Sequence, residues 1–75
     1  MLPRQCRAAR ALLDLTQPEL AERAAVSPST LRDFESGKRA PIANNLAAIR
    51  AALEQAGVIF IEENGQGPGV RLRKE

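Results

Sequence analysis

The side chains that could do chemistry in this sequence are mainly arginines. Nine of the eleven basic residues are arginine, whereas histidine is absent and cysteine occurs once, as Cys6. A guanidinium group binds phosphate or the edge of guanine through two parallel hydrogen bonds. Without histidine and with one thiol, a single chain cannot form a Ser-His-Asp or Cys-His catalytic unit or a structural zinc site. The residue types therefore favour binding to a polyanion over catalysis or metal binding.

Two other patterns superficially resemble enzyme sites. Glu62 and Glu63 are neighbours in a segment expected to be a strand, where adjacent side chains point to opposite faces and cannot form a catalytic pair. The glycine-rich segment 65–69 has no following helix and no Lys-Ser/Thr pair, so a turn is favoured over a phosphate-binding loop. We therefore expect a protein that is not an enzyme and that has no cofactor.

The length and composition of the chain limit its organisation. Seventy-five residues, 44% apolar and with a net charge of +2, make one small globular domain. A pI of about 9.3 suits a polyanionic partner without demanding one. The single thiol fits a reducing compartment, and no apolar run approaches the roughly 20 residues that cross a bilayer. These features predict a cytoplasmic protein with no membrane association.

Start and stop signals divide the first three-quarters of the chain into short helices. Thr16 and Glu19 match a capping box, in which each side chain bonds the backbone N–H of the other. Ser27 and Pro28 form a second start signal, an N-cap followed by proline at the first helical position. Gly37 is the expected left-handed stop. With the apolar spacing, these signals predict helices over residues 3–13, 17–24, 28–36 and 43–56.

The last residues have a different pattern. Val58–Ile61 is β-branched and aromatic, and glycines bound it on both sides. Residues 70–73 alternate between apolar and arginine. We expect an antiparallel hairpin that pairs residues 58–63 with 70–74. The chain then consists of a helical unit over 1–57 and a hairpin over 58–75 that belongs to the same domain.

The helices over 17–24 and 28–36 are separated by about three residues, as in a helix-turn-helix. The stretch LTQPELAERAAVSPSTLRDFESGKRAP closely resembles the Cro/C1 (Xre-type) family of DNA-binding regulators. The resemblance extends from about Arg7 to Ala56. It implies a mainly α fold: a compact four-helix repressor-like helix-turn-helix domain, here with a C-terminal β-hairpin. Ala25 departs from the family, whose turn commonly has glycine there, so this turn either strains a left-handed alanine or rearranges. The matching positions are Gln17, Leu20, Ala21, Val26, Leu31, Phe34–Lys38 and Pro41.

The resemblance implies that the second helix of the pair lies in the major groove of double-stranded DNA, with its N-terminal residues at the base edges. Leu31 and Phe34 are spaced to face the core, which leaves the residues between them outward. Arg32 could pair with guanine, and Asp33 could accept from cytosine N4. The candidates for base contacts are Pro28, Ser29, Thr30, Arg32 and Asp33.

Four other residues are candidates for phosphate contacts. Gln17 resembles the phosphate-binding glutamine of the family, at the start of the helix that precedes the recognition helix. Ser27 is expected to cap the recognition helix and to contact phosphate as well. Lys38 and Arg39 follow that helix and would hold the backbone on its far side.

A structural role is expected for three further residues. In relatives, an arginine of the first helix pairs with the acid that ends the recognition helix, and the resemblance places Arg10 and Glu35 at these positions. We expect this ion pair to stabilise the fold. Cys6 is expected to be a small core residue, with a redox sensor as the alternative.

The predicted hairpin has more apolar surface than one small core can cover. Val58 and Phe60 share one face of the strand, and Ile59 and Ile61 share the other. We therefore expect a homodimer in which the hairpin forms most of the interface. The expected interface residues are Val58, Ile59, Phe60, Ile61, Val70 and Leu72.

Three classes of function remain open. The favoured one is a sequence-specific regulator of transcription, a bacterial or phage-like homodimeric repressor associated with the nucleoid. The alternative is an antitoxin or anti-activator, which uses the same fold to bind a toxin or an activator through its hairpin. An RNA-binding domain is least favoured, because side chains that stack on bases are nearly absent.

Overall fold

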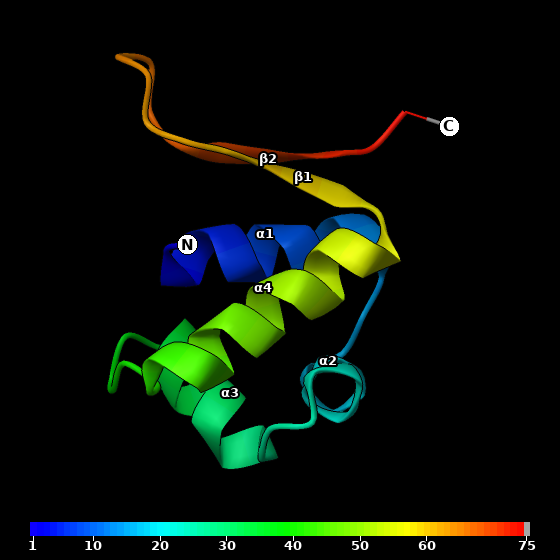
Figure 1. Cartoon of the computed structure of the whole chain (residues 1–75), viewed down its shortest axis with the longest axis vertical. Coiled ribbons are helices and arrows are strands. Elements are labelled where there is room, and N and C mark those ends of the chain that lie inside the picture. Colours follow the sequence, from blue (N-terminus) through cyan, green and yellow to red (C-terminus); the bar gives the residue numbers. More distant parts are fainter. Residues whose placement is uncertain (75) are drawn as a thin grey trace.

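The computed structural model describes residues 1–74. Four helices precede a two-stranded antiparallel sheet, which confirms the predicted fold class (Figure 1). The strands are shorter than the predicted 58–63 and 70–74, and Glu75, the last residue of the predicted hairpin unit, lies outside the described residues. In chain order the elements are α1 (Pro3–Leu13), α2 (Gln17–Ala24), α3 (Pro28–Glu35), α4 (Ala43–Ala56), β1 (Val58–Ile61) and β2 (Gly69–Leu72).

The helices of the central pair begin at the predicted caps. The Thr16 hydroxyl accepts a hydrogen bond from the Glu19 N–H at 3.2 Å, and the Glu19 carboxylate accepts one from the Thr16 N–H at 2.9 Å. The Ser27 hydroxyl accepts a hydrogen bond from the Thr30 N–H at 3.1 Å. Each cap satisfies a backbone donor that lacks a partner within its helix, so the start of both helices is fixed locally.

Left-handed residues end three of the helical segments. Gly37 has φ of 78°, as predicted for the stop after α3, and Asp14 ends α1 with φ of 55°. Ala25 also has φ of 55°, so the turn between α2 and α3 keeps the left-handed geometry despite its Cβ. This conformation costs an alanine about 1 kcal/mol.

Replacing Ala25 with glycine should therefore stabilise the chain. We expect Ala25→Gly to raise the free energy of unfolding by up to about 1 kcal/mol, because glycine adopts a left-handed conformation without strain. Urea denaturation followed by circular dichroism measures the change. Ala47→Gly, at an exposed position inside α4, is the matched control and should lower stability by about 1 kcal/mol. Equal destabilisation by both variants would contradict the strain at Ala25.

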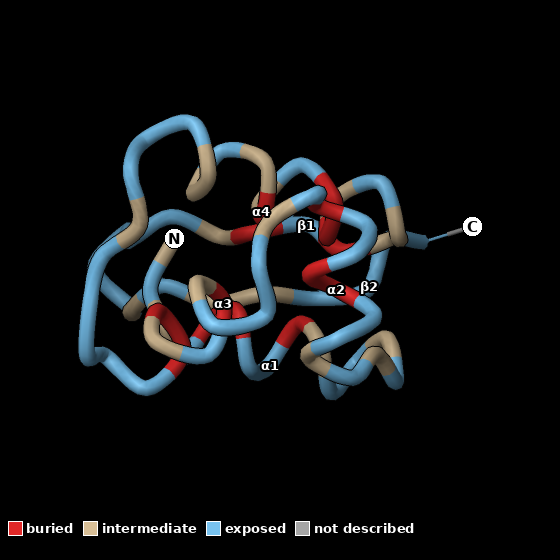
Figure 2. The backbone as a smooth tube through the Cα atoms, turned by 90° about the horizontal axis from the view of Figure 1, so that it is seen from below, coloured by how far each residue is buried: buried red, intermediate tan, exposed pale blue. Residues whose placement is uncertain are grey.

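The core lies where the four helices and β1 meet. The largest fully buried apolar side chains come from α2, α3, α4 and β1, and Figure 2 shows the buried segments toward the middle of the molecule. Cys6 and Ala9 contribute the small side chains of α1 that allow close packing. The core residues are Cys6, Ala9, Leu20, Ala21, Ala24, Leu31, Phe34, Ile49, Ala52, Leu53, Val58 and Phe60.

The hairpin covers α1 and α4 on the side opposite α2 and α3 (Figure 1). Val58 pairs with Leu72 and Phe60 pairs with Val70. Directly opposite residues share a face, so these four side chains are on the face toward the helices. Two of the six expected interface residues, Val58 and Phe60, are consequently buried in the core of their own chain, whereas Ile59 is on the outer face and is 37% exposed.

A buried glutamine fastens the hairpin to α1. The Gln5 amide N–H donates to the carbonyl oxygen of Gly69 at 3.0 Å, and its oxygen accepts from the Leu2 N–H at 2.7 Å. Gln5 thus caps the start of α1 and also positions β2.

Among residues 1–74, no helix has both the length and the apolarity needed to cross a bilayer.

Candidate nucleic-acid interface

Helix α3 presents a polar face to solvent and an apolar face to the core. Leu31 and Phe34 are buried, as predicted from their spacing. The Arg32 side chain is 66% exposed, and Asp33 beside it is 22% exposed. Their Nε–Oδ1 distance of 3.7 Å makes a loose surface pair, so the guanidinium group can reorient toward a ligand. Three of the residues predicted to contact bases are exposed, namely Pro28, Ser29 and Arg32, and Thr30 and Asp33 are half-buried.

The hydroxyl groups at the start of α3 form a small cluster. The Ser27 Oγ lies 2.8 Å from Thr30 Oγ1 and 3.2 Å from Ser29 Oγ. These contacts orient all three hydroxyls on the exposed first turn of the helix. A hydroxyl donates one hydrogen bond and accepts two, so the Ser29 and Thr30 hydroxyls retain capacity for a base or phosphate contact. The Ser27 hydroxyl also accepts the cap bond from the Thr30 N–H, so its three bonds use its full capacity.

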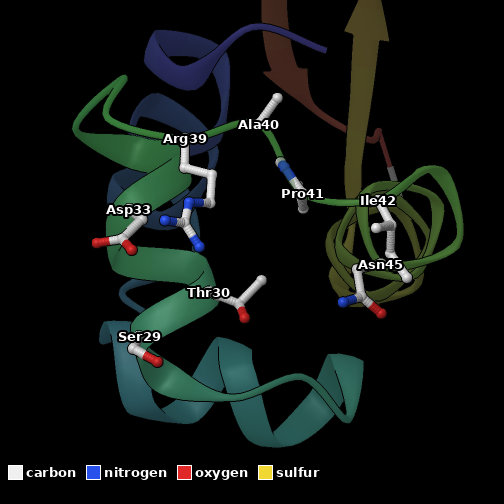
Figure 3. A pocket seen from close by; sticks show the side chains of 8 residues that line it. All are labelled: Ser29, Thr30, Asp33, Arg39, Ala40, Pro41, Ile42 and Asn45. Carbon is white, nitrogen blue, oxygen red and sulfur yellow. The ribbon is translucent and has the colours of Figure 1, made fainter.

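A hollow of about 260 Å³ separates α3 from the start of α4 (Figure 3). Ser29, Thr30 and Asp33 form its α3 side, and Arg39 extends from the loop 36–42 toward them. Asn45, from the first turn of α4, closes the opposite side. Polar groups from three elements therefore share one surface next to the exposed face of α3.

The structure adds Asn45 to the residues found from sequence. The sequence does contain a clue to this residue, because two polar residues, Asn44 and Asn45, occupy the first turn of the helix that follows the recognition helix. Their closeness to Thr30 depends on how α4 packs, which no local pattern reveals.

Backbone hydrogen bonds fix the loop that leaves α3. The N–H groups of Lys38 and Arg39 donate to the Asp33 carbonyl at 2.9 and 3.3 Å, and the Gly37 N–H donates to the Phe34 carbonyl at 3.0 Å. The side chains of Lys38 and Arg39 remain exposed. Two cations are thus held on a defined loop at the C-terminal end of α3.

The carboxylate of Glu35 joins three helices. Arg10 Nε lies 2.7 Å from Oε2 and Arg10 Nη2 lies 2.7 Å from Oε1, so the predicted ion pair is present and bidentate. The Gln17 amide donates to Oε1 at 2.9 Å, and the Cys6 thiol donates to Oε2 at 3.2 Å. The Glu35 side chain is only 2% exposed. The four residues Cys6, Arg10, Gln17 and Glu35, called the Glu35 cluster below, fix α2 and α3 relative to α1.

Gln17 has a structural role that sequence analysis did not assign. It was predicted to contact phosphate, yet one of its amide N–H groups is engaged with Glu35. An amide has two N–H donors and a carbonyl oxygen, so groups remain for a second partner. The side chain is half-buried at the start of α2.

Charge and burial shift the ionisation of the Glu35 cluster. Burial raises the pKa of Glu35, but hydrogen bonds from Arg10, Gln17 and Cys6 outweigh it and hold the pKa below its ordinary value. The hydrogen bond with Glu35 raises the pKa of Arg10. Burial, reinforced by the hydrogen bond to Glu35, raises the pKa of the Cys6 thiol far above its ordinary value. Because the thiolate is the reactive form, these shifts favour a structural Cys6 over a redox sensor.

Arg7 places another cation near the end of α3. Its Nη1 group donates to the backbone carbonyl of Glu35, and it lines a hollow with Arg4, Ser36 and Gly37. The basic start of α1 therefore continues toward the loop that carries Lys38.

Comparisons with known proteins agree with this geometry. The helix-turn-helix family HTH_3 matches residues 7–57, from α1 through the end of α4. A comparison with curated proteins found no significant match. The matched region covers more than half of the chain and includes α2, α3 and every member of the Glu35 cluster except Cys6. The chain belongs to the Cro/C1-type helix-turn-helix family of DNA-binding regulators.

Proposed function

We propose that the protein is a homodimeric repressor that recognises a specific operator by inserting α3 into the major groove. The observation that carries this proposal is the exposed Arg32 on a helix whose other face is locked into the core. A major groove about 12 Å wide accepts one helix. The protein would then act in the cytoplasm at the nucleoid, and two-fold symmetry would present two copies of α3 to two half-sites.

Base recognition in this proposal comes from the exposed side of α3. Arg32 bonds guanine N7 and O6, and Asp33 accepts from cytosine N4. Ser29 and Thr30 reach neighbouring base edges, and Pro28 makes an apolar contact.

Phosphate contacts come from both ends of the central helix pair. Gln17 and Ser27 approach one strand with the free N–H groups at the starts of α2 and α3. Lys38 and Arg39 approach the backbone from the loop after α3. These contacts set the position of α3 without reading sequence.

The phosphate contacts predict a steep salt dependence. We expect Lys38→Ala to weaken binding to all duplexes alike and to reduce the slope of log affinity against log salt by about one, because one fewer counterion is released. Fluorescence anisotropy over a salt series measures this, on the operator found by selection from random duplexes. Arg23→Ala, an exposed change in the last turn of α2, is the control and should leave the slope unchanged. Wild-type affinity that does not change with salt would contradict DNA binding through phosphates.

The alternative of an antitoxin or anti-activator is favoured by one surface. Leu12, Leu13 and Leu72 line a hollow between α1 and the hairpin, and the Leu72 side chain is 51% exposed. A toxin or activator could bind there. A salt-dependent, sequence-selective affinity for duplex DNA distinguishes the repressor from a module that binds only protein.

A further inference from the structure

We infer that Arg4 and Arg7 of α1 form a further phosphate-binding site, which holds the DNA backbone beside the C-terminal end of α3. The site lies outside the phosphate contacts proposed above and extends them along the strand that Gln17 contacts. This inference rests on the proposed function, because its ligand is the backbone of the duplex that α3 enters. The spacing of the arginines, their lack of carboxylate partners within residues 1–74 and the hollow that they line carry it.

The arginines of α1 are spaced to form one stripe. Arg4, Arg7 and Arg10 recur every three residues, and side chains three apart are neighbours on a helix surface. No acidic residue precedes Asp14 in the sequence, so the stripe contains no charge of the opposite sign. At a rise of about 1.5 Å per residue, the stripe extends over roughly 9 Å, on the order of the axial rise of two to three phosphates of one DNA strand.

Two members of the stripe have charges that no carboxylate neutralises. The Arg10 guanidinium is paired with the buried carboxylate of Glu35. The ion pairs within residues 1–74 include neither Arg4 nor Arg7, and both residues are exposed. Arg7 donates from Nη1 to the Glu35 carbonyl, which positions its guanidinium group and leaves most of its five N–H donors for a ligand. Less side-chain freedom is then lost when a phosphate binds.

Arg4 and Arg7 line a hollow of about 360 Å³ beside the end of α3. Ser36 and Gly37, where the loop after α3 begins, form its other side. Figure 1 places the start of α1 and this loop at the same end of the molecule. The one acidic residue among the described residues that line the hollow is Glu35, whose carboxylate is buried against Arg10. The hollow therefore presents two guanidinium groups and no free carboxylate to an anion.

The hollow lies on the side of α3 that carries Arg32. Arg32 and Ser36 are four residues apart, so Ser36 continues the exposed side of the helix by one turn. Gln17, the proposed phosphate contact at the start of α2, bonds the Glu35 carboxylate, and Arg7 bonds the carbonyl of the same residue. A DNA strand held at Gln17 therefore passes the hollow as it follows the groove alongside α3.

A cation at this position also offsets the charge at the end of the recognition helix. The last carbonyl groups of a helix have no partner within it and carry a partial negative charge, which repels phosphate. Arg7 binds one of these groups, the Glu35 carbonyl. Lys38 and Arg39 add cations on the loop that follows. The backbone of a duplex thus meets positive charge at the end of α3.

A salt series tests the site by fluorescence anisotropy. We expect Arg4→Gln and Arg7→Gln each to reduce the slope of log affinity against log salt by about one, and the double variant by about two, because each lost contact releases one fewer counterion. The losses should be equal on the selected operator and on random duplexes, since phosphate contacts read no sequence. Arg23→Gln, which removes the same charge from the last turn of α2, should leave the slope unchanged.

Neutral phosphate analogues locate the contact on the operator. Methylphosphonate is placed at one position at a time. Replacing the phosphate that the hollow holds should weaken binding of the wild type but should not weaken binding of Arg4→Gln/Arg7→Gln any further, because the contact is already lost. That phosphate should lie on the same strand as the one identified in the same way with Gln17→Ala. Its location on the opposite strand would overturn the path of the backbone inferred here.

Arg4→Gln keeps the test independent of folding. Arg4 is exposed and forms no ion pair within residues 1–74, so its urea midpoint should match that of the wild type. Unchanged salt slopes in both single variants, beside salt-dependent binding by the wild type, would overturn the site on α1 and leave the proposed function in place. Losses confined to the operator would overturn the assignment to phosphate. A wild type with no affinity for any duplex would overturn the proposed function itself.

Discussion

Replacing Glu35 with glutamine is expected to lower the free energy of unfolding by about 3 kcal/mol. The glutamine has nearly the same shape but leaves the guanidinium of Arg10, whose side chain is only 20% exposed, without its charged partner. Removing one partner of a buried ion pair costs about 3–5 kcal/mol. A domain of 75 residues has a total stability of about 4–11 kcal/mol, so the change is large. Urea denaturation of both proteins at neutral pH measures it.

An exposed ion pair supplies the control for Glu35. Arg50 Nε lies 3.3 Å from the Glu54 carboxylate, and both side chains are more than a third exposed. Glu54→Gln should lower stability by less than about 1 kcal/mol, because solvent screens an exposed pair. Similar small losses from Glu35→Gln and Glu54→Gln would contradict the stabilising role of the Glu35 cluster.

Acid should remove the contribution of Glu35. Its pKa in the folded chain lies below its ordinary value, so its stabilisation is complete above the unfolded pKa, about 4.3, and is lost as the pH falls through the folded pKa. Hydrogen bonds from backbone N–H groups also lower the pKa of Glu19 and of Glu63. The pH dependence of wild-type stability therefore includes contributions from other carboxylates. The difference in the free energy of unfolding between wild type and Glu35→Gln isolates the contribution of Glu35. We expect that difference to shrink below about pH 4.

The sequence predicted those parts of the fold that depend on residues close to one another along the chain. The caps at Thr16 and Ser27 and the stop at Gly37 each need only residues three or four positions away, so their patterns are visible in the chain. Gln5 is the opposite case, because its partner Gly69 is 64 residues away. The bond from Gln17 to Glu35 likewise depends on how α2 packs against α3.

The hairpin shows why strand ends were not predicted. The Glu63 carboxylate accepts hydrogen bonds from the N–H groups of Gly65 at 2.7 Å and Gly67 at 2.9 Å. These bonds close a turn, so Glu63 does not continue the strand and β1 ends at Ile61. The face assignment of Val58 and Phe60 followed from strand alternation alone. Which of the two faces α1 and α4 would cover required the packed structure.

The position of Arg32 makes it the sharpest test of base recognition. Its only salt bridge among the described residues is the 3.7 Å surface contact with Asp33, so its removal should change folding stability by less than about 1 kcal/mol. Any loss of affinity then reports binding rather than folding. Lys38, on the loop after α3, is also exposed to solvent but is proposed to contact phosphate, which makes it the matched comparison.

Arg32→Ala is expected to weaken binding to the selected operator by about 1–3 kcal/mol, roughly five- to 150-fold, while affinity for random duplexes changes little. The reason is that a bidentate contact with guanine exists only where the operator supplies that base. Anisotropy titrations at one fixed salt concentration, with operator and random duplexes in parallel, measure the two affinities. Lys38→Ala should lower both affinities by the same factor. Equal losses on operator and random DNA for Arg32→Ala would instead place Arg32 at the phosphate backbone, and sequence recognition would then have to come from Ser29, Thr30 and Asp33.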